Sequence, residues 1–242
     1  MKKRSLVARV SGRIRKMLGV PMKQPAADAP PDIRRVLRKT EIGVIFDVGA
    51  NIGQSARRCT KCFPEAQIYA FEPDQNNFTR LTRLVRKNRN LKCYRLAMSS
   101  KPGTLQIIHN SRDPTMHRVS ADATGEVESI PATTIDAFCA EHRIERIDYL
   151  KIDTEGHDLE VLKGSHEMLS SDRISIVEVE CGMNPGNTYH VPFETMKPRL
   201  EGYGYRLFRL YDQVCEWPTR EPHLRRANAV YLSPRTISEN RD

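Results

Sequence analysis

The sequence has no apolar run that approaches the roughly 20 residues of a membrane-spanning helix. It also lacks the uninterrupted apolar stretch of a secretory signal, because Arg9 and Arg13 interrupt the apolar residues near its start. We therefore expect a cytoplasmic protein. The length of 242 residues suits one globular domain with a short appendage, and a hydrophobic content of 39% suffices for one core.

Cysteines with metal-ligand spacing are almost absent. Cys59 and Cys62 form a Cys-x-x-Cys pair, but no second pair and no pair of histidines at zinc-finger spacing follows. The pair also falls inside a segment that the sequence predicts to be a helix, where the knuckle of a zinc site is not expected. We predict no zinc site and expect all six cysteines to be reduced thiols, the usual state in the cytoplasm.

Acidic residues are missing from the first 27 positions. Eight cations precede the first acid, Asp28, and account for nearly all of the net charge of +9: Lys2, Lys3, Arg4, Arg9, Arg13, Arg15, Lys16 and Lys23. The rest of the chain is therefore close to neutral. This balance argues against a domain that binds nucleic acid.

The same N-terminal segment has the pattern of an amphipathic helix. Its apolar residues recur at helical spacing among the cations: Leu6, Val10, Ile14, Met17 and Leu18. Such a helix can bind anionic lipid, which would give peripheral membrane contact, or an acidic partner; a solvated or core-capping helix is an open alternative. The Pro-rich stretch 21–31 predicts a linker. We expect residues 1–31 to form this basic arm and linker, and residues 32–242 to form the globular domain.

Two phosphate-binding motifs are also missing, since the chain contains neither Gly-Lys-Ser/Thr nor a complete Gly-x-Gly-x-x-Gly. Instead, an apolar strand at 44–48 contains Asp47 and leads into the turn 49–53 and a helix from Gln54. Glycines let a ligand approach the backbone closely, and a helix start presents unpaired N–H groups. A simpler interpretation stays open, in which Asp47 caps the helix and the glycines only turn the chain.

A second strand ends in an acid at the distance expected of a ribose-binding residue. Glu72 follows the strand 68–71 and lies 19 positions after Gly53, where about 20 is typical. The carboxylate of Asp47 would repel a pyrophosphate, but it suits a ligand that carries an ammonium group and a sulfonium. The combination predicts a Rossmann-like site for S-adenosylmethionine (SAM). A nicotinamide cofactor is disfavoured by Asp47 and by Asn51 in the turn.

Strand and helix signals alternate along the rest of the chain. We expect further strands at 91–95, 103–109, 147–152, 174–180, 205–211 and 227–232, and helices at 74–88, 134–142, 158–169 and 193–201. Residues 116–130 fit neither pattern. The alternation predicts an α/β fold, with a Rossmann-like, doubly wound and mainly parallel sheet that has an antiparallel edge strand.

Polar residues follow the strand 147–152 at its carboxyl end, the edge at which open α/β sheets bind ligands. They are Asp153, Glu155 and His157. Glu180 ends the strand 174–180. Its side chain could line the same crevice or bind a metal ion together with Asp153. His190, in the loop after that strand, is a further candidate for lining the pocket, although most loop histidines have no chemical role.

Three motifs together resemble the FkbM family of SAM-dependent methyltransferases: DVGANIG at 47–53, FEP at 71–73 and KIDTEGHDLEVLKG at 151–164. The resemblance covers residues 42–232 and implies a seven-stranded sheet and O-methylation of sugar, polyketide or other natural-product hydroxyls. It implies that the first motif holds the methionine part of SAM, that the acid of the second takes the ribose, and that the loop 96–98 borders the adenine. The predicted cofactor-binding residues are Asp47, Gly49, Ala50, Asn51, Gly53, Glu72 and Ala97.

Methyl transfer to oxygen needs an in-line approach and a group that takes the hydroxyl proton, because the sulfonium is already activated. The predicted catalytic residues, any of which could be this base, are Asp153, Glu155 and His157. Structural alternatives stay open for each: a helix cap for Asp153, an ion pair with Lys151 or Lys163 for Glu155, and an exposed helix position for His157. A divalent cation is an optional cofactor that could acidify the hydroxyl, but we predict no metal site.

The sequence thus predicts a SAM-dependent methyltransferase whose partner is a small-molecule, glycan or natural-product acceptor. The alternative is a non-catalytic SAM-fold binding or scaffold protein that is tethered by its basic arm. The acceptor itself is not predicted, because the loops that would surround it, at 110–130 and 181–192, carry no motif.

Overall fold

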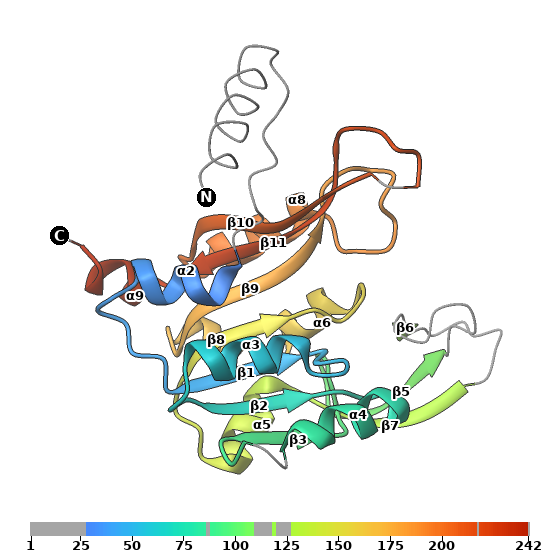
Figure 1. Ribbon diagram of the computed structural model, residues 1–242, viewed down its shortest axis with the longest axis horizontal. Coiled ribbons are helices and arrows are strands. Elements are labelled where there is room, and N and C mark those ends of the chain that lie inside the picture. The colour runs from blue at the N-terminus through green and yellow to red at the C-terminus, as the bar shows by residue number, and fades with distance from the viewer. Residues whose placement is uncertain (1–27, 86–87, 109–117, 120–126, 217, 242) are drawn as a thin grey trace, which may run out of the picture.

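A seven-stranded sheet forms the centre of the computed structural model, which describes residues 28–85, 88–108, 118–119, 127–216 and 218–241 (Figure 1). The strand order is β10-β11-β9-β8-β1-β2-β3. The strands are β1 (Val44–Val48), β2 (Gln67–Phe71), β3 (Leu91–Tyr94), β8 (Ile147–Ile152), β9 (Ile174–Gly182), β10 (Arg206–Cys215) and β11 (Leu224–Leu232). The predicted mainly parallel sheet is confirmed. Its antiparallel strand is β11, which pairs with β9 and β10 and so lies one position in from the edge.

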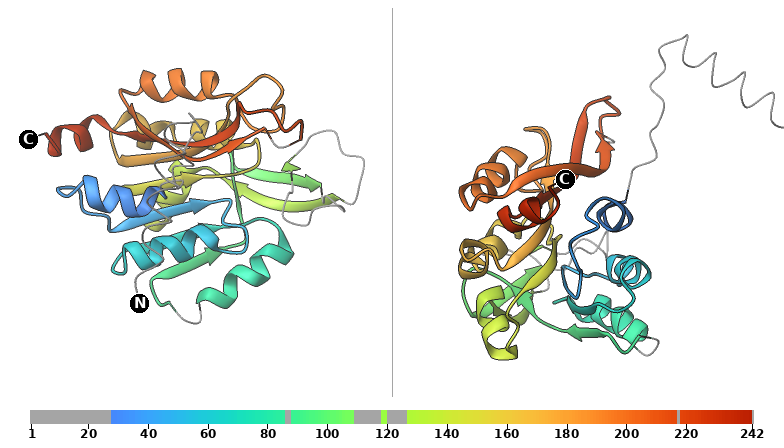
Figure 2. Two further views of the ribbon diagram at one scale, coloured as in Figure 1. Left: turned by 45° about the horizontal axis from the view of Figure 1, so that its top comes forward. Right: turned by 90° about the vertical axis from the view of Figure 1, so that its left-hand side faces the viewer.

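Helices cover both faces of the sheet (Figure 2). One face carries α2 (Ala29–Val36), α3 (Gln54–Cys62), α4 (Gln75–Val85) and the C-terminal α9 (Pro234–Glu239). The other carries α5 (Ile135–His142), α6 (Asp158–Lys163), α7 (His166–Ser170) and α8 (Phe193–Gly202). Within the described residues, no helix is long and apolar enough to span a membrane.

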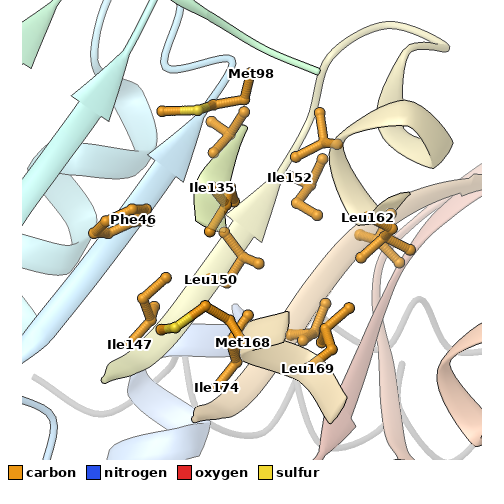
Figure 3. Close-up of a cluster of buried hydrophobic side chains, with 14 of the residues drawn as sticks. Phe46, Met98, Ile135, Ile147, Leu150, Ile152, Leu162, Met168, Leu169 and Ile174 are labelled. Atoms are coloured by element: carbon orange, nitrogen blue, oxygen red, sulfur yellow. The ribbon is translucent and has the colours of Figure 1, made fainter. Parts of the chain in front are cut away.

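Two apolar cores follow from this layering. Successive strand residues point to opposite faces, so in β1 Phe46 and Val48 join the cluster on the α5–α8 face, while Ile45 joins the cluster on the other face. Figure 3 shows the first cluster, in which Leu150 and Ile152 of the adjacent strand continue the layer. Strands that are buried on both faces have continuous apolar sequences. Their positions could therefore be predicted well from the sequence.

Helix α2 begins inside the stretch that the sequence predicted to be a linker. Pro30 and Pro31 occupy its first turn, where a proline costs nothing because those N–H groups have no helical partner. Ala29 and Ile33 are buried against the body, and Asp32 accepts a hydrogen bond from the Tyr211 hydroxyl at 2.8 Å. The globular domain therefore includes residues 29–31. The arm itself lies outside the described residues.

The helix predicted at 158–169 is instead two helices, α6 and α7. They separate at Gly164, where a β-carbon would lie 2.0 Å from the carbonyl oxygen of Ser99. The backbone of residue 99 thus passes too close for a side chain at position 164. Nothing in the local sequence pattern marks this approach.

A second, four-stranded sheet was not predicted. Its order is β4 (Ala97–Met98), β7 (Val127–Thr133), β5 (Gly103–Ile108), β6 (Arg118–Val119), and β5 pairs with β7 as an antiparallel ribbon that extends away from the main sheet (Figures 1 and 2). Residues 116–130, to which the sequence assigned no element, contain β6 and the start of β7. The remaining residues of the loop 110–130, between these strands, lie outside the described part of the chain.

Candidate functional site

A cavity of about 840 Å³ opens at the carboxyl ends of the parallel strands. Its lining joins the turn after β1, the segments 71–73 and 96–98, the loop after β8, the end of β9 and charged residues of β11. Open α/β sheets bind their ligands at this edge, and a volume of this order suits a nucleoside-sized ligand with a second molecule beside it.

The turn after β1 is clamped between two other strand ends. The N–H groups of Gly49 and Ala50 both donate to the carbonyl oxygen of Phe71, at 3.0 Å each. Gly49 has φ +79°, and a β-carbon there would lie 1.9 Å from the carbonyl oxygen of Asp153. Gly49, Ala50 and Asn51 line the cavity, as expected of cofactor-binding residues.

Two predicted cofactor residues do not line the cavity. Gly53, at φ +91°, directly precedes α3 as its N-cap residue, and a β-carbon there would collide with Leu81 and Leu84, so it serves the packing of α3 on α4. Asp47 is fully buried beneath the turn, and neither of its oxygens reaches a donor at hydrogen-bond distance. Burial raises the pKa of Asp47 to about 6, although the ammonium of Lys151 favours the ionised form.

Glu72 directly follows β2, lines the cavity and is almost fully buried. One of its oxygens accepts the N–H of Asn51 at 2.7 Å, and the other accepts that of Asp74 at 2.9 Å. Burial outweighs these hydrogen bonds and raises the pKa of Glu72 to about 7. Each oxygen keeps a second lone pair, so Glu72 remains able to accept hydrogen bonds from ribose hydroxyls.

His157 lies beside the segment predicted to border the adenine. Its Nε2 is 2.9 Å from the Ser99 hydroxyl, next to Ala97 and Met98, which line the cavity. Burial lowers the pKa of His157, so its ring is neutral near pH 7. His157 is therefore not a plain exposed helix residue.

Asp153 makes an ion pair rather than a helix cap. Its carboxylate lies 2.7 Å from Nζ of the buried Lys151. Although burial acts in the opposite direction, this ammonium lowers the pKa of Asp153, and the carboxylates around it raise the pKa of Lys151. Asp158, the first residue of α6, instead orders the loop before the helix by accepting the N–H groups of Thr154 and Gly156 at 3.0 and 3.1 Å.

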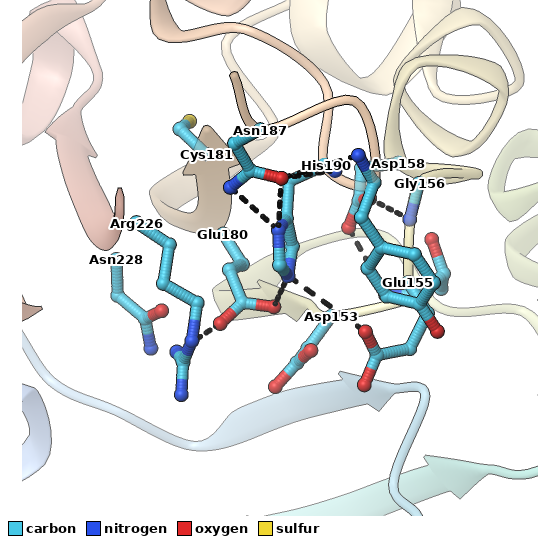
Figure 4. Close-up of polar contacts among 12 residues, drawn as sticks. Asp153, Glu155, Gly156, Asp158, Glu180, Cys181, Asn187, His190, Arg226 and Asn228 are labelled. Atoms are coloured by element: carbon cyan, nitrogen blue, oxygen red, sulfur yellow. Dashed lines mark hydrogen bonds and ion pairs between the residues drawn. The ribbon is translucent and has the colours of Figure 1, made fainter. Parts of the chain in front are cut away.

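Glu155 pairs with neither Lys151 nor Lys163, but faces a histidine. Its backbone is left-handed, at φ +54°, and its carboxylate lies 3.7 Å from Nε2 of His190 (Figure 4). Burial, Asp153 and Glu180 raise the pKa of Glu155 to about 7, against the influence of His190. A carboxylate with a pKa near neutrality is suited to act as a base.

The partners of His190 come from two further strands. Its Nε2 also lies 2.9 Å from Glu180, whose other oxygen is paired with Arg226 of β11. The sequence pointed to Glu180 and His190, but Arg226 was missed, because no local pattern shows which strand pairs with β9. Glu155, Glu180 and His190 place one ligand atom each within 4.8 Å of one another, a donor set that could also hold a divalent cation.

The sequence model of the methyltransferase FkbM domain matches residues 47–207, which is more than half of the chain. The chain belongs to the FkbM methyltransferase family. The matched region contains every predicted cofactor-binding and catalytic residue, and also Glu180 and His190, whereas Arg226 follows it.

Relatives of this FkbM protein include two named methyltransferases. The hexuronic acid methyltransferase AglP of Haloferax volcanii is 33% identical over 160 residues, which cover 63% of each chain. The 2-O-methyltransferase NoeI of Sinorhizobium fredii is 25% identical, over 56% of this chain and 62% of its own. The match thus spans less than two thirds of either relative.

Among solved structures, a SAM-dependent methyltransferase from Aquifex aeolicus is 14% identical with a TM-score of 0.46, over 90% of this chain and 97% of its own.

Proposed function

We propose that this FkbM-family protein transfers the methyl group of SAM to a hydroxyl of a sugar or related natural-product acceptor. The observation that carries the proposal is that the same cavity is lined by the glycine turn, by Glu72 and by a group of charged side chains that includes Glu155. The names of the two relatives, a hexuronic acid methyltransferase and a 2-O-methyltransferase, support a sugar acceptor.

The chain's own residues fit SAM on one side of the cavity. The turn at 49–51 would hold the methionine part, Glu72 would accept the ribose hydroxyls, and the segment 96–98 would border the adenine. When bound, SAM supplies a methyl group that its sulfonium has already activated. The protein then has to position an acceptor oxygen in line with that group and remove its proton.

Glu155 is the proposed base among the three candidates. It faces the cavity, and its pKa of about 7 lets it be ionised and still bind a proton well near neutral pH. Asp153 is a weaker base, because Lys151 holds it in the ionised form. The Nε2 atom of His157 is engaged with the hydroxyl of Ser99. Glu155 takes the hydroxyl proton as the acceptor oxygen bonds to the methyl carbon, and the electrons of the broken carbon–sulfur bond stay on sulfur.

The test is a methylation assay on a panel of acceptors. The purified protein is incubated with SAM that carries a ¹³C methyl group and with 4-nitrophenyl glycosides of hexoses and hexuronic acids. We expect a new O-methyl carbon signal on at least one glycoside, with one S-adenosylhomocysteine formed per product and no change in rate on adding EDTA. SAM binding by calorimetry without any methylated product would favour the scaffold alternative. Binding of NAD without SAM affinity would favour a nicotinamide enzyme.

A further inference from the structure

Four side chains of alternating charge form a row in the lining of the cavity (Figure 4). Arg226 of β11 pairs with one oxygen of Glu180, at the end of β9, and the other oxygen lies 2.9 Å from Nε2 of His190. That same nitrogen is 3.7 Å from the carboxylate of Glu155. The row crosses three separate segments of the chain, and only its last member, Glu155, has been given a role above.

His190 is held in place from both sides of its ring. The Asn187 oxygen accepts the backbone N–H groups of Tyr189 and His190 at 3.1 and 3.2 Å, and the Asn187 nitrogen donates to the Arg225 carbonyl at 2.9 Å. This fixed amide lies 3.0–3.1 Å from Nδ1 of His190. The ring therefore cannot turn away from the two carboxylates without breaking these contacts.

The charges around His190 favour its protonated form. Two carboxylates, Glu155 and Glu180, face Nε2, and Arg226 neutralises one of them. Asp153 is also near, but Lys151 compensates it. One negative charge remains, which an imidazolium balances. In agreement, the hydrogen bond and charge of Glu180 raise the pKa of His190 against the opposite effect of its burial.

We propose that His190 is a positioning residue for the methyl transfer proposed above, and that its imidazolium holds Glu155 toward the cavity and keeps that carboxylate ionised. Without this cation, burial and the remaining influence of the carboxylates of Asp153, Glu180 and Asp158 would raise the pKa of Glu155 further, so that it would bind a proton before the acceptor arrives. A protonated Glu155 cannot take the hydroxyl proton. The inference rests on the proposed function, but its test does not depend on turnover alone.

The test replaces the imidazolium by a neutral group of similar reach, in His190→Gln. Removing a cation beside a carboxylate raises the pKa of the carboxylate, so the acid limb of the kcat–pH profile should move up by about one unit. At pH values below the limb kcat should fall by about tenfold, while the plateau at high pH and the affinity for SAM stay unchanged. His190→Lys restores a positive charge and should move the limb back. His166→Gln is the matched control, because His166 lies on α7 against Tyr203 and does not line the cavity.

A second measurement needs no acceptor. In protein labelled with ¹³C at the glutamate side-chain carboxyl carbons, Glu155→Gln identifies the Glu155 signal, and its titration midpoint should move to higher pH in His190→Gln. This result would stand even if no glycoside of the panel were methylated. An unchanged midpoint, or a kcat that falls equally at every pH, would show that His190 only holds the loop 183–191. Binding of Mn²⁺ by the wild type at pH 7 that His190→Gln abolishes would make the cluster a cation site and overturn the inference.

Discussion

The carbonyl oxygen of Asp153 lies 1.9 Å from the point at which a β-carbon on residue 49 would stand. The backbone N–H of Asp153 also donates to the carbonyl oxygen of Val48 at 2.9 Å. The glycine turn after β1 and the acidic loop after β8 are therefore in direct backbone contact. The proposed cofactor side and the proposed catalytic side of the cavity share this junction.

Gly49→Ala should disrupt the junction, because alanine meets both a backbone clash and an unfavourable positive φ. We expect the free energy of unfolding to fall by ~2–4 kcal/mol and SAM binding to be lost. Urea unfolding and calorimetry measure the two effects. Gly202→Ala is the control, since a β-carbon there meets nothing within 4 Å. Equal stability of the two variants would contradict the contact.

Glu72→Gln should change how stability depends on pH. The folded-state pKa of Glu72, about 7, lies above its ordinary value of 4.5. The stability that this group contributes is therefore fully present below pH 4.5 and is lost as the pH rises through 7. Glutamine does not titrate, so the wild type should lose up to about 3 kcal/mol more than the variant between pH 5 and pH 8. Urea unfolding at the two pH values measures this difference.

The same Glu72→Gln variant tests the ribose assignment. We expect its affinity for SAM to fall by about tenfold at pH 8, because the amide offers one acceptor oxygen where the carboxylate offers two. Calorimetry on the folded variant measures the change. An unaltered affinity would leave Glu72 only the role of holding the N–H groups of Asn51 and Asp74.

Glu155→Gln should reduce kcat by ~10²-fold, the usual scale for a lost general base, with little change in stability.

Asp153→Asn should behave differently, because it leaves the buried Lys151 without its nearest counter-charge. For that variant we expect unfolding to become easier by ~2–4 kcal/mol, with a smaller loss of kcat in the folded fraction.

Assays of both variants on one methylated glycoside, together with urea unfolding, separate the two roles. Glu160→Gln is the control, since Glu160 pairs with the exposed Lys163 and does not line the cavity. A larger loss of kcat for Asp153→Asn than for Glu155→Gln would transfer the role of base to Asp153.

The basic arm gives a prediction about location. We propose that residues 1–23 hold the enzyme at an anionic cytoplasmic membrane surface, at ~1 kcal/mol for each cation near the lipid. Deleting them should abolish salt-sensitive sedimentation with anionic vesicles and leave SAM affinity unchanged. The deletion ends before α2, so the truncated protein keeps the buried residues Ala29 and Ile33 of that helix. Full-length protein that does not sediment at low salt would refute this role, and a truncated protein that unfolds would make the arm part of the core.

The sequence alone determined the main sheet and the place of the site. Strands buried on both faces are continuous apolar runs, so β1, β2, β8 and β9 could be located from composition and alternation. Because parallel strands bring their carboxyl ends to one edge, residues that follow them, such as Glu72 and Glu155, were expected near one another without any knowledge of contacts. The turn at 49–53 was likewise visible from its glycines.

Only the tertiary structure decided which side chains meet in that site. Insertion of β11 beside β9 brings Arg226 to Glu180, and the loop after β9 folds back to place His190 between Glu180 and Glu155. These contacts join residues that are far apart in the chain, and no local spacing encodes them. The same holds for Gly164, between α6 and α7, where the carbonyl of Ser99 leaves no room for a side chain, and for Gly53, whose missing side chain makes room for α4 rather than for a ligand.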